Sequence, residues 1–377
     1  MKRTHIFCVE TKFGYLVADV VRNYLKRAEE EGDQSRFIVL SANRNFANFN
    51  TAAWDHIAGV ENLPPKSHRF SWRYFSSLVK GIRSVCMAQN LELANMDRDT
   101  EVHIYVQTVH KFLSNFMYFY TKRTTNVHFH LIQDGLGVYS FHRSFIRQFT
   151  YQVLAWLFAR MHHFRYHLYG GHVLGMNQSG IERLYLLYSQ YLAETQGLAA
   201  RYGLDLIFLS QSFEGYLRTL EPRGKTAVAA PRISGTLFLG FEGFIDVYSQ
   251  KYYSGLLKSI FHELGKSGVQ EVYYLPHPAM RPTARPYVEG LLENLAEQHG
   301  IRLQMAENTA MPLEIKLVSL YEKLGFTGIR GVRSSGLLSI ASLYPGQFDL
   351  HCYTPAKMTR KKNFLRFEHL GIRETII

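Results

Sequence analysis

The sequence predicts an α/β protein built from two Rossmann-like halves. Strands and helices alternate along the chain, a segment rich in proline, glycine and basic residues interrupts them once, and the alternation then restarts. Alternating strands and helices build parallel sheets with helices on both faces. At 377 residues the chain is also longer than one ordinary hydrophobic core, which favours two domains.

Apolar runs and helical spacing predict the elements of the first half in order. Strands are expected at 4–9, 36–41, 101–108, 127–132 and 204–209. Helices are expected at 15–31, 72–94, 111–120 and 181–202, together with a basic aromatic helix at 141–169.

The second half repeats the pattern after the interruption. Strands are expected at 236–239, 272–275, 301–305 and 348–353, with a short strand or turn at 325–329. Helices are expected at 248–264, 287–299, 312–324 and 337–343.

Two such halves predict a GT-B-type architecture with the active site in the cleft between the domains. The domains expected are an N-terminal Rossmann-like domain (1–220) and a C-terminal Rossmann-like domain (235–355). A linker (221–234) joins them, and a basic tail (356–377) follows.

The net charge indicates the kind of binding partner, and the cysteine content indicates the redox compartment. The net charge of +12 favours an anionic partner, which nucleic acid, anionic lipid or a phosphorylated substrate would supply. Cys8, Cys86 and Cys352 are few and scattered, so we expect neither a disulfide framework nor a zinc site, and a reducing cytoplasm. We also expect no signal peptide and no membrane-spanning helix.

Two chemically capable residues follow predicted strands. His277 lies between Pro276 and Pro278 after the strand 272–275, and Asp134-Gly135 follows the strand 127–132. Open α/β sheets bind ligands at the carboxyl ends of their strands. There, Asp134 could deprotonate a sugar hydroxyl, and a protonated His277 could hydrogen-bond a phosphate oxygen. The alternatives are a turn-capping aspartate and a core histidine.

Ser334-Ser335-Gly336 opens a predicted helix in the second half. The serine pair is typical of a helix N-cap, and the same free amides and hydroxyls form an anion site, so the two interpretations are compatible. Arg330 and Arg333 add positive charge nearby. Glu314 lies in the first turn of another predicted helix, where an acid suits the helix dipole and could also bridge two ribose hydroxyls.

The metal patterns in the sequence are weak. Asp97-Arg98-Asp99 matches a DxD metal motif, but three residues match by chance often. His163 and His167 are four apart, without a nearby carboxylate ligand. No G-x-G-x-x-G, Walker A or G-x-S-x-G pattern is present. We therefore expect no metal and no cofactor.

Basic residues interleave with aromatic ones in the segment 141–169 and in the tail 357–366. Such segments can be solvated faces, nucleic-acid sites or interfacial membrane helices. The bunching of apolar residues beside cations favours the membrane. These residues are Leu154, Trp156, Leu157 and Phe158, with Arg147, Arg160 and Arg165.

Together the motifs resemble those of the bacterial sialyltransferases. That family shares a D/E-D/E-G motif, an HP motif and a serine pair in this order, and Gln133-Asp134-Gly135, His277-Pro278 and Ser334-Ser335 follow it. The opening IFCVETKFGYLVA and the later TLFLG are similar to the lipooligosaccharide sialyltransferases of glycosyltransferase family 52, with the polysialyltransferases close behind. Gln133 departs from the acidic residue usual at the first motif position.

The resemblance implies an inverting, metal-independent sialyltransferase. It would move N-acetylneuraminic acid from CMP-sialic acid to a terminal sugar, galactose, of a bacterial surface glycan such as lipooligosaccharide or capsule. The N-terminal domain would bind the acceptor and the C-terminal domain the donor. Asp134, beside Gly135, would be the base and His277, beside Pro278, would assist departure of CMP. Ser334, Ser335 and Gly336 would bind its phosphate and Glu314 its ribose.

The partners implied are CMP-sialic acid, a lipid-linked glycan acceptor and an anionic membrane surface, with no nucleic acid. The implied location is cytoplasmic, peripheral at the inner face of the bacterial membrane, and a homodimer is compatible with the sequence. Two alternatives stay open: a hexosyl- or Kdo-transferase on the same fold, and a non-catalytic protein that binds membrane or nucleic acid.

Overall fold

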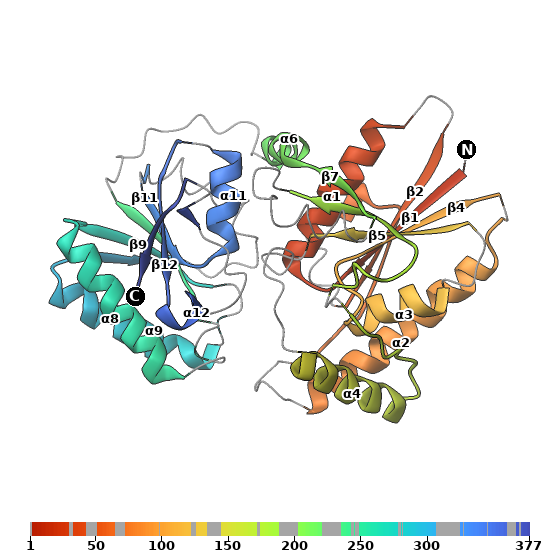
Figure 1. Ribbon diagram of the computed structural model, residues 1–377, viewed down its shortest axis with the longest axis horizontal. Coiled ribbons are helices and arrows are strands. Elements are labelled where there is room, and N and C mark those ends of the chain that lie inside the picture. Colours follow the sequence, from red (N-terminus) through yellow and green to blue (C-terminus); the bar gives the residue numbers. More distant parts are fainter. Residues whose placement is uncertain are drawn as a thin grey trace. The chain divides into compact units, whose positions relative to one another are not determined.

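The computed structural model of the chain consists of two compact units, Met1–Tyr216 and Leu217–Ile377 (Figure 1). It describes residues 2–29, 33–42, 51–64, 72–97, 99–121, 126–133, 145–171, 174–187, 203–220, 235–242, 245, 249–277, 280, 282–306, 325–326, 328–344, 346–359, 367–368 and 371–377.

The first unit contains a parallel sheet of seven strands in the order β3-β2-β1-β4-β5-β6-β7. Its strands are β1 (Lys2–Val9), β2 (Gln34–Ser41), β3 (His56–Gly59), β4 (Glu101–Val106), β5 (Val127–Ile132), β6 (Ile181–Leu186) and β7 (Asp205–Phe208). The central strands end in continuous buried runs, as expected for parallel strands covered on both faces.

Helices cover both faces of this sheet (Figure 1). They are α1 (Lys12–Arg27), α2 (Trp72–Ala94), α3 (Phe112–Thr121), α4 (Phe145–Met161) and α6 (Ser210–Leu220). Helix α1 starts at the N-cap Thr11, whose side chain accepts a hydrogen bond from the Gly14 amide. Its buried Asp19 accepts a hydrogen bond from Tyr216 of α6, which fixes the two helices to one another.

The second unit contains a parallel sheet of six strands in the order β10-β9-β8-β11-β12-β13. Its strands are β8 (Thr236–Leu239), β9 (Glu271–Leu275), β10 (Arg302–Met305), β11 (Gly328–Val332), β12 (Asp349–Thr354) and β13 (Arg373–Ile376). Its helices are α8 (Gln250–Lys266), α9 (Arg285–Gln298), α11 (Ser335–Leu343) and α12 (Ala356–Thr359).

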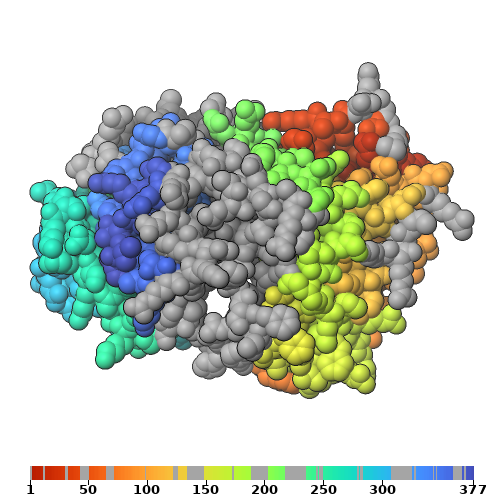
Figure 2. Space-filling view, viewed as in Figure 1, coloured from red at the N-terminus to blue at the C-terminus, as the bar shows by residue number. Residues whose placement is uncertain are grey.

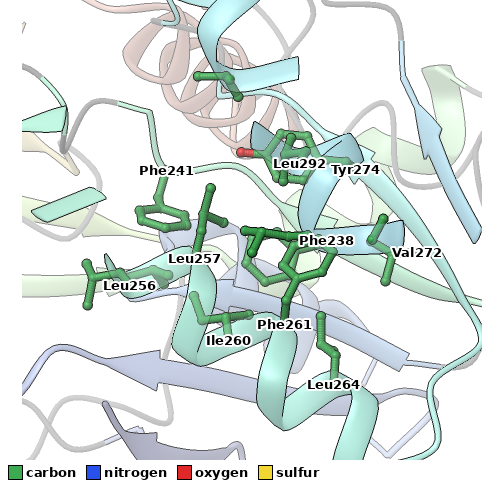
Figure 3. Packing of buried hydrophobic residues seen from close by; sticks show 14 of the residues in the cluster. Phe238, Phe241, Leu256, Leu257, Ile260, Phe261, Leu264, Val272, Tyr274 and Leu292 are labelled. Atoms are coloured by element: carbon green, nitrogen blue, oxygen red, sulfur yellow. The ribbon is translucent and has the colours of Figure 1, made fainter. Parts of the chain in front are cut away.

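The core of the second unit lies between the sheet and the helices α8 and α9 (Figure 3). Helix α8 buries Leu256, Leu257, Ile260, Phe261 and Leu264, a spacing that places all five on one face. They pack with sheet residues such as Phe238, which stacks on Tyr274 at 5.6 Å between ring centroids. This packing fixes the carboxyl ends of the strands, after which His277 and Ser334 lie.

The two-sheet α/β architecture is confirmed, two local predictions are wrong, and one strand was missed. The segment 181–202 was expected to be a helix, but its first residues form β6. Strand β3 was not expected at all. Residues after 355 were expected to form a tail, yet β13 pairs with β12 in register and belongs to the sheet. The predicted linker 221–234 and helix 312–324 lie outside the described residues.

Two further observations concern the cysteines and the membrane. Cys8, Cys86 and Cys352 are buried and form no disulfide. Within the described ranges, none of the helices has the length and apolarity needed to cross a bilayer.

Candidate functional site

Each sheet has a point at which its strand order reverses. In the first unit the reversal lies between β1 and β4, and in the second it lies between β8 and β11. Connections from the neighbouring strands leave in opposite directions at such a point, so a crevice opens beyond the carboxyl ends of the strands. The described site residues all follow strands at these edges: Gln133 after β5, His277 after β9 and Ser334 after β11.

The loop after β9 is fixed by a buried carboxylate that the sequence analysis missed. Glu242 is 3% exposed, and its Oε2 accepts the backbone amide of His277 at 2.8 Å. Its Oε1 accepts the hydroxyl of Tyr274 at 2.8 Å, and Tyr253 lies 3.2 Å from that hydroxyl. Burial raises the pKa of Glu242, while the hydrogen bonds from its own backbone, His277 and Tyr274 lower it. The signal in the sequence is an acid three residues beyond the predicted strand 236–239.

Gly240 is required by the same contacts. A Cβ atom at this position would lie 2.7 Å from the Glu242 carboxylate and 2.8 Å from the backbone nitrogen of His277. Because the backbone amide of Gly240 also donates to Leu275 at 2.8 Å, the chain cannot shift freely to make room. A side chain here would therefore separate β8 from the loop that carries His277.

The His277 side chain is exposed, while its backbone is fixed. Its carbonyl accepts the amide of Met280 at 2.8 Å, which closes a turn. Desolvation by the surrounding protein lowers the pKa of His277 below its usual value. In either protonation state the imidazole keeps at least one N–H that can donate a hydrogen bond.

Ser334 caps the N-terminus of α11 as predicted. Its backbone is extended, with φ −86° and ψ 135°, and its Oγ accepts the amide of Gly336 at 3.1 Å. The hydroxyl hydrogen of Ser334 is not used by this cap. Ser335 is half-buried in the first turn beside it, so two hydroxyl groups lie at the positive end of the helix dipole.

The two arginines near this helix are held by other side chains. The guanidinium of Arg333 lies 3.5 Å from Glu374 and 4.9 Å from the ring centroid of Phe367, and its backbone has a left-handed φ of 43°. Arg330 is buried, with Nη1 3.3 Å from the Tyr353 hydroxyl. Both arginines add positive potential below the helix N-terminus while they tie β11 to its neighbours.

In the first unit, Gln133 joins the ends of two strands. It is fully buried, and its side-chain Oε1 accepts the backbone amide of Leu187 at 2.9 Å. The backbone amide of Gln133 donates to the carbonyl of Tyr185 at 3.0 Å. The first position of the acidic motif therefore has a structural role in this chain. Asp134, Gly135, Pro278 and Glu314 lie outside the described residues.

A second polar network, also missed, lies at the reversal point of the first sheet. Gln107 accepts the amide of Glu10 at 2.7 Å and donates to the hydroxyl of Thr11 at 2.9 Å. Glu10 in turn accepts the amide and the hydroxyl of Ser114, at 3.2 and 3.1 Å. Both Glu10 and Gln107 directly follow buried strands, which is the signal that could have identified them.

No group of three or more metal-ligating side chains occurs among the residues that the structure describes. Asp97 of the DxD pattern forms an ion pair with Lys2 at 3.3 Å, and Arg98 lies outside those residues. His167 packs on Phe119 at 4.1 Å between ring centroids.

Solved structures with similar folds place the chain in the GT-B class. A UDP-GlcNAc 2-epimerase from Methanocaldococcus jannaschii, solved with UDP-GlcNAc and UDP, aligns with a TM-score of 0.54 at 10% identity, over 99% of this chain and 88% of its own. Another UDP-N-acetylglucosamine 2-epimerase aligns at 0.50 and 12% identity, over 96% and 80%. A putative UDP-N-acetylglucosamine 2-epimerase from Listeria monocytogenes aligns with a TM-score of 0.53 at 11% identity, over 94% of this chain and 79% of its own.

The chain has a GT-B fold. The predicted fold class, with its two Rossmann-like domains, is thereby confirmed. No protein-family model matches the sequence, and no curated protein matches it either.

Proposed function

We propose that this protein is an inverting, metal-independent sialyltransferase. It moves N-acetylneuraminic acid from CMP-sialic acid to a terminal sugar, galactose, of a bacterial surface glycan such as lipooligosaccharide or capsule. The GT-B fold supports sugar transfer in general, because it is shared with enzymes that bind sugar nucleotides. The order of the QDG, HP and SS motifs supports the choice of donor.

The observation that carries the proposal is the pairing of two loops in the second unit. His277 follows β9 and Ser334 follows β11, and β8 lies between these strands. Adjacent strands are about 4.8 Å apart, so the two loops start roughly 10 Å from one another. One nucleotide phosphate with its attached sugar spans that distance. The amides and hydroxyls at the N-terminus of α11 suit the phosphate.

In the proposed reaction the acceptor hydroxyl oxygen attacks the anomeric carbon of sialic acid. A new C–O bond forms, the bond from that carbon to the phosphate oxygen breaks, and CMP leaves with the electron pair. Asp134 accepts the hydroxyl proton. The imidazole of His277 donates a hydrogen bond to the phosphate oxygen on which charge develops, and the proposed Ser334 and Ser335 contacts share that charge.

The role of Gln133 supports Asp134 as the base. Because Gln133 is buried and bonded to Leu187, the departure from the acidic motif changes a structural contact. The remaining proposed roles complete the site: Gly336 binds the phosphate with the serine pair, Gly135 and Pro278 take part in donor binding beside the two catalytic residues, and Glu314 binds the ribose. The reaction as proposed requires Asp134 and His277 to meet at one substrate.

Release of CMP from CMP-sialic acid, with a β-galactoside as acceptor, tests the proposal. We expect Asp134→Asn to lower kcat by roughly 10²–10⁴-fold, as for loss of a general base. His277→Ala should lower it by about 10²-fold, as for loss of one charge-stabilising donor. His262→Ala, an exposed histidine of α8, is the matched control and should leave kcat unchanged. Full activity in the Asp134 and His277 variants would contradict the assigned roles.

A second candidate is transfer from a UDP-hexose, or of Kdo. The similarity to a structure solved with UDP-GlcNAc and UDP favours a uridine nucleotide. Incubation with UDP-GlcNAc, UDP-galactose and CMP-Kdo separates the candidates. Consumption of one of these donors, without release of CMP from CMP-sialic acid, would replace the proposal. A chain that consumes none of the four donors would contradict both candidates.

A further inference from the structure

Helix α4 presents its large apolar residues outward. The residues that it buries are polar or small: Gln148, Gln152, Ala155 and Ala159. The residues that it exposes include Phe149 (55%), Leu154 (57%), Leu157 (45%) and Met161 (57%). In water, an isolated surface helix is more stable with the opposite orientation, because burial of apolar area contributes about 25 cal/mol per Å².

Specific hydrogen bonds hold this orientation. Gln148 donates from Nε2 to the carbonyl of Gly171 at 3.1 Å, and Gln152 accepts the amide of Tyr169 at 2.9 Å. The two glutamines thus fix the helix against the segment that follows it. A helix rotated to bury the leucines would leave these backbone groups without their partners.

The apolar surface continues onto the start of α2. Trp72 is 57% exposed, and its ring meets the edge of Phe158 of α4 at 4.5 Å between centroids. Phe75, one helical turn further along α2, contacts the same ring at 6.2 Å. Figure 2 shows α4 (yellow) at the surface of the first unit. We call the exposed residues Trp72, Phe149, Leu154, Leu157 and Met161 the α4 surface.

The charge around the α4 surface has one sign. The sequence contains no aspartate or glutamate from 135 to 181, and none from 72 to 91. Arg160 and Lys80 are exposed at its border. Desolvation lowers the pKa of His162, and the nearby Lys80 lowers it further. Exposed apolar side chains bordered by cations match the interface of a bilayer that contains anionic lipid.

We propose that the α4 surface docks into the interface of an anionic lipid bilayer, with α4 parallel to the membrane plane. A second copy of the chain is a poorer occupant, because two cationic surfaces repel one another. Nucleic acid is poorer too, because leucine and methionine side chains do not stack on bases as aromatic rings do. The docking stands independently of sialyl transfer. If both hold, the docked enzyme works where a lipid-linked acceptor is located, at the inner face of the membrane.

Flotation of the full-length protein with vesicles tests the docking. We expect the protein to float with phosphatidylcholine vesicles that contain 30% phosphatidylglycerol (about one lipid in three, for a strongly anionic surface), and less with phosphatidylcholine alone. Leu154→Gln with Leu157→Gln should lower the partition coefficient roughly tenfold, because two apolar side chains no longer enter the interface. Arg160→Gln and Lys80→Gln should each lower the preference for anionic vesicles roughly fivefold.

Matched controls lie elsewhere on the chain. Leu91 is 66% exposed near the far end of α2, about 28 Å along the helix from Trp72, and Leu91→Gln should leave flotation unchanged. Lys258→Gln, on α8 of the second unit, is the control for charge. The substituted leucines are exposed, so the circular dichroism spectrum should be that of the wild type. Failure of the wild type to float, equal losses in the controls, or a dimer that only the leucine pair disrupts would overturn the proposal.

Discussion

The two units share one pattern of strand order but hold their carboxyl-edge loops by different chemistry. In the first unit two side-chain amides bond the backbone of neighbouring loops, those of Gln107 and Gln133, and the half-buried carboxylate of Glu10 accepts from Ser114. In the second unit a buried carboxylate does so, since Glu242 accepts from the backbone of His277 and from Tyr274. Strand order therefore decides where the loops lie and leaves open how they are held. Among the described residues, the carboxylate that holds the loop of the second unit, Glu242, is buried, whereas Glu10 of the first unit is half-buried.

The sheets differ in the same way beneath these edges. In the first unit a row of rings crosses the strands: His5 stacks on Phe37 at 4.8 Å and on His103 at 5.0 Å. In the second unit Tyr274 and Phe238 start the corresponding row, and the cation Arg330 follows them. The first unit thus contains several buried groups that must stay neutral, whereas the second contains a paired cation.

Acid should destabilise the first unit more than the second, and this is the largest effect we expect. Desolvation lowers the pKa of His5 to about 3 and of His103 to about 4, and lowers that of His130 well below its usual value. Below pH 6.5 the unfolded chain therefore binds more protons than the folded chain. As the pH is lowered, the free energy of unfolding decreases by about 1.4 kcal/mol per pH unit for each such histidine. In the second unit His351, whose pKa is lowered to about 4, and His277, whose pKa desolvation also lowers, contribute in this way.

Hydrogen exchange measured between pH 7 and pH 5 resolves the two units. Neighbouring charges act on the row as well: Glu101 lies 3.6 Å from His103 and Glu182 lies 2.7 Å from His128, while Arg3 and Arg183 oppose protonation. Glu242 has a raised pKa and so favours the second unit as the pH falls toward 4.5. Equal loss of protection in both units would show that the histidine row does not control acid stability.

The next largest effect is the loss of stability when one methyl group is added at the carboxyl edge of each sheet. Gly240→Ala forces a Cβ within 2.8 Å of a backbone nitrogen and of a buried carboxylate, and should cost about 3 kcal/mol of unfolding free energy. Gly14→Ala meets the side-chain amide of Gln107, within 2.4 Å, and should cost about 2 kcal/mol because that side chain can move. Urea unfolding measures both. Gly290→Ala, in open space on α9, is the control and should not destabilise. A larger loss for Gly14→Ala would reverse the comparison.

Exchanging the amide of Gln133 for a carboxylate, and the carboxylate of Glu242 for an amide, tests which chemistry each loop requires. Gln133→Glu places a carboxylate at a fully buried position and should cost about 2 kcal/mol at pH 7, and less at pH 5 where the carboxyl is protonated. Glu242→Gln keeps one acceptor oxygen and should cost about 1 kcal/mol. Its donor KM should rise because the His277 loop is held less firmly. An unchanged donor KM in the Glu242→Gln variant would show that Glu242 does not position the donor site.

The smallest effect concerns the cap of α11. Ser334→Ala removes the hydroxyl that accepts the Gly336 amide, and should cost about 1 kcal/mol. Ser335→Ala leaves the bond between the Ser334 hydroxyl and the Gly336 amide intact and should cost less, while both variants should weaken binding of CMP. Differential scanning calorimetry with and without CMP measures the two effects together. Equal CMP affinity in both variants and the wild type would limit the serines to a structural role.

Much of the fold follows from local pattern. Helix α2 and strand β5 have the bounds that apolar spacing predicts. A helix was predicted at 181–202 because Ile181, Leu184 and Leu186 fit a helical face as well as a buried strand. The pairing of β6 with β5 and β7 decides in favour of the strand. β13 contains only one large apolar residue, Ile376, so its place in the sheet depends on backbone pairing that no local pattern shows.

The candidate site was only partly predictable. His277 and Ser334 follow strands, and that position is visible in the sequence. The Glu242 network is not visible, because it joins residues that are 32 and 35 positions apart and depends on which strands are neighbours. The structural role of Gln133 depends in the same way on β6, which the sequence analysis did not identify.

A crystal structure with CMP tests the central claim most directly. The account predicts that the phosphate lies against the amides and hydroxyls of Ser334, Ser335 and Gly336, within hydrogen-bond distance of the His277 ring. CMP bound at the edge of the first sheet, or no binding of CMP where UDP binds, would contradict it.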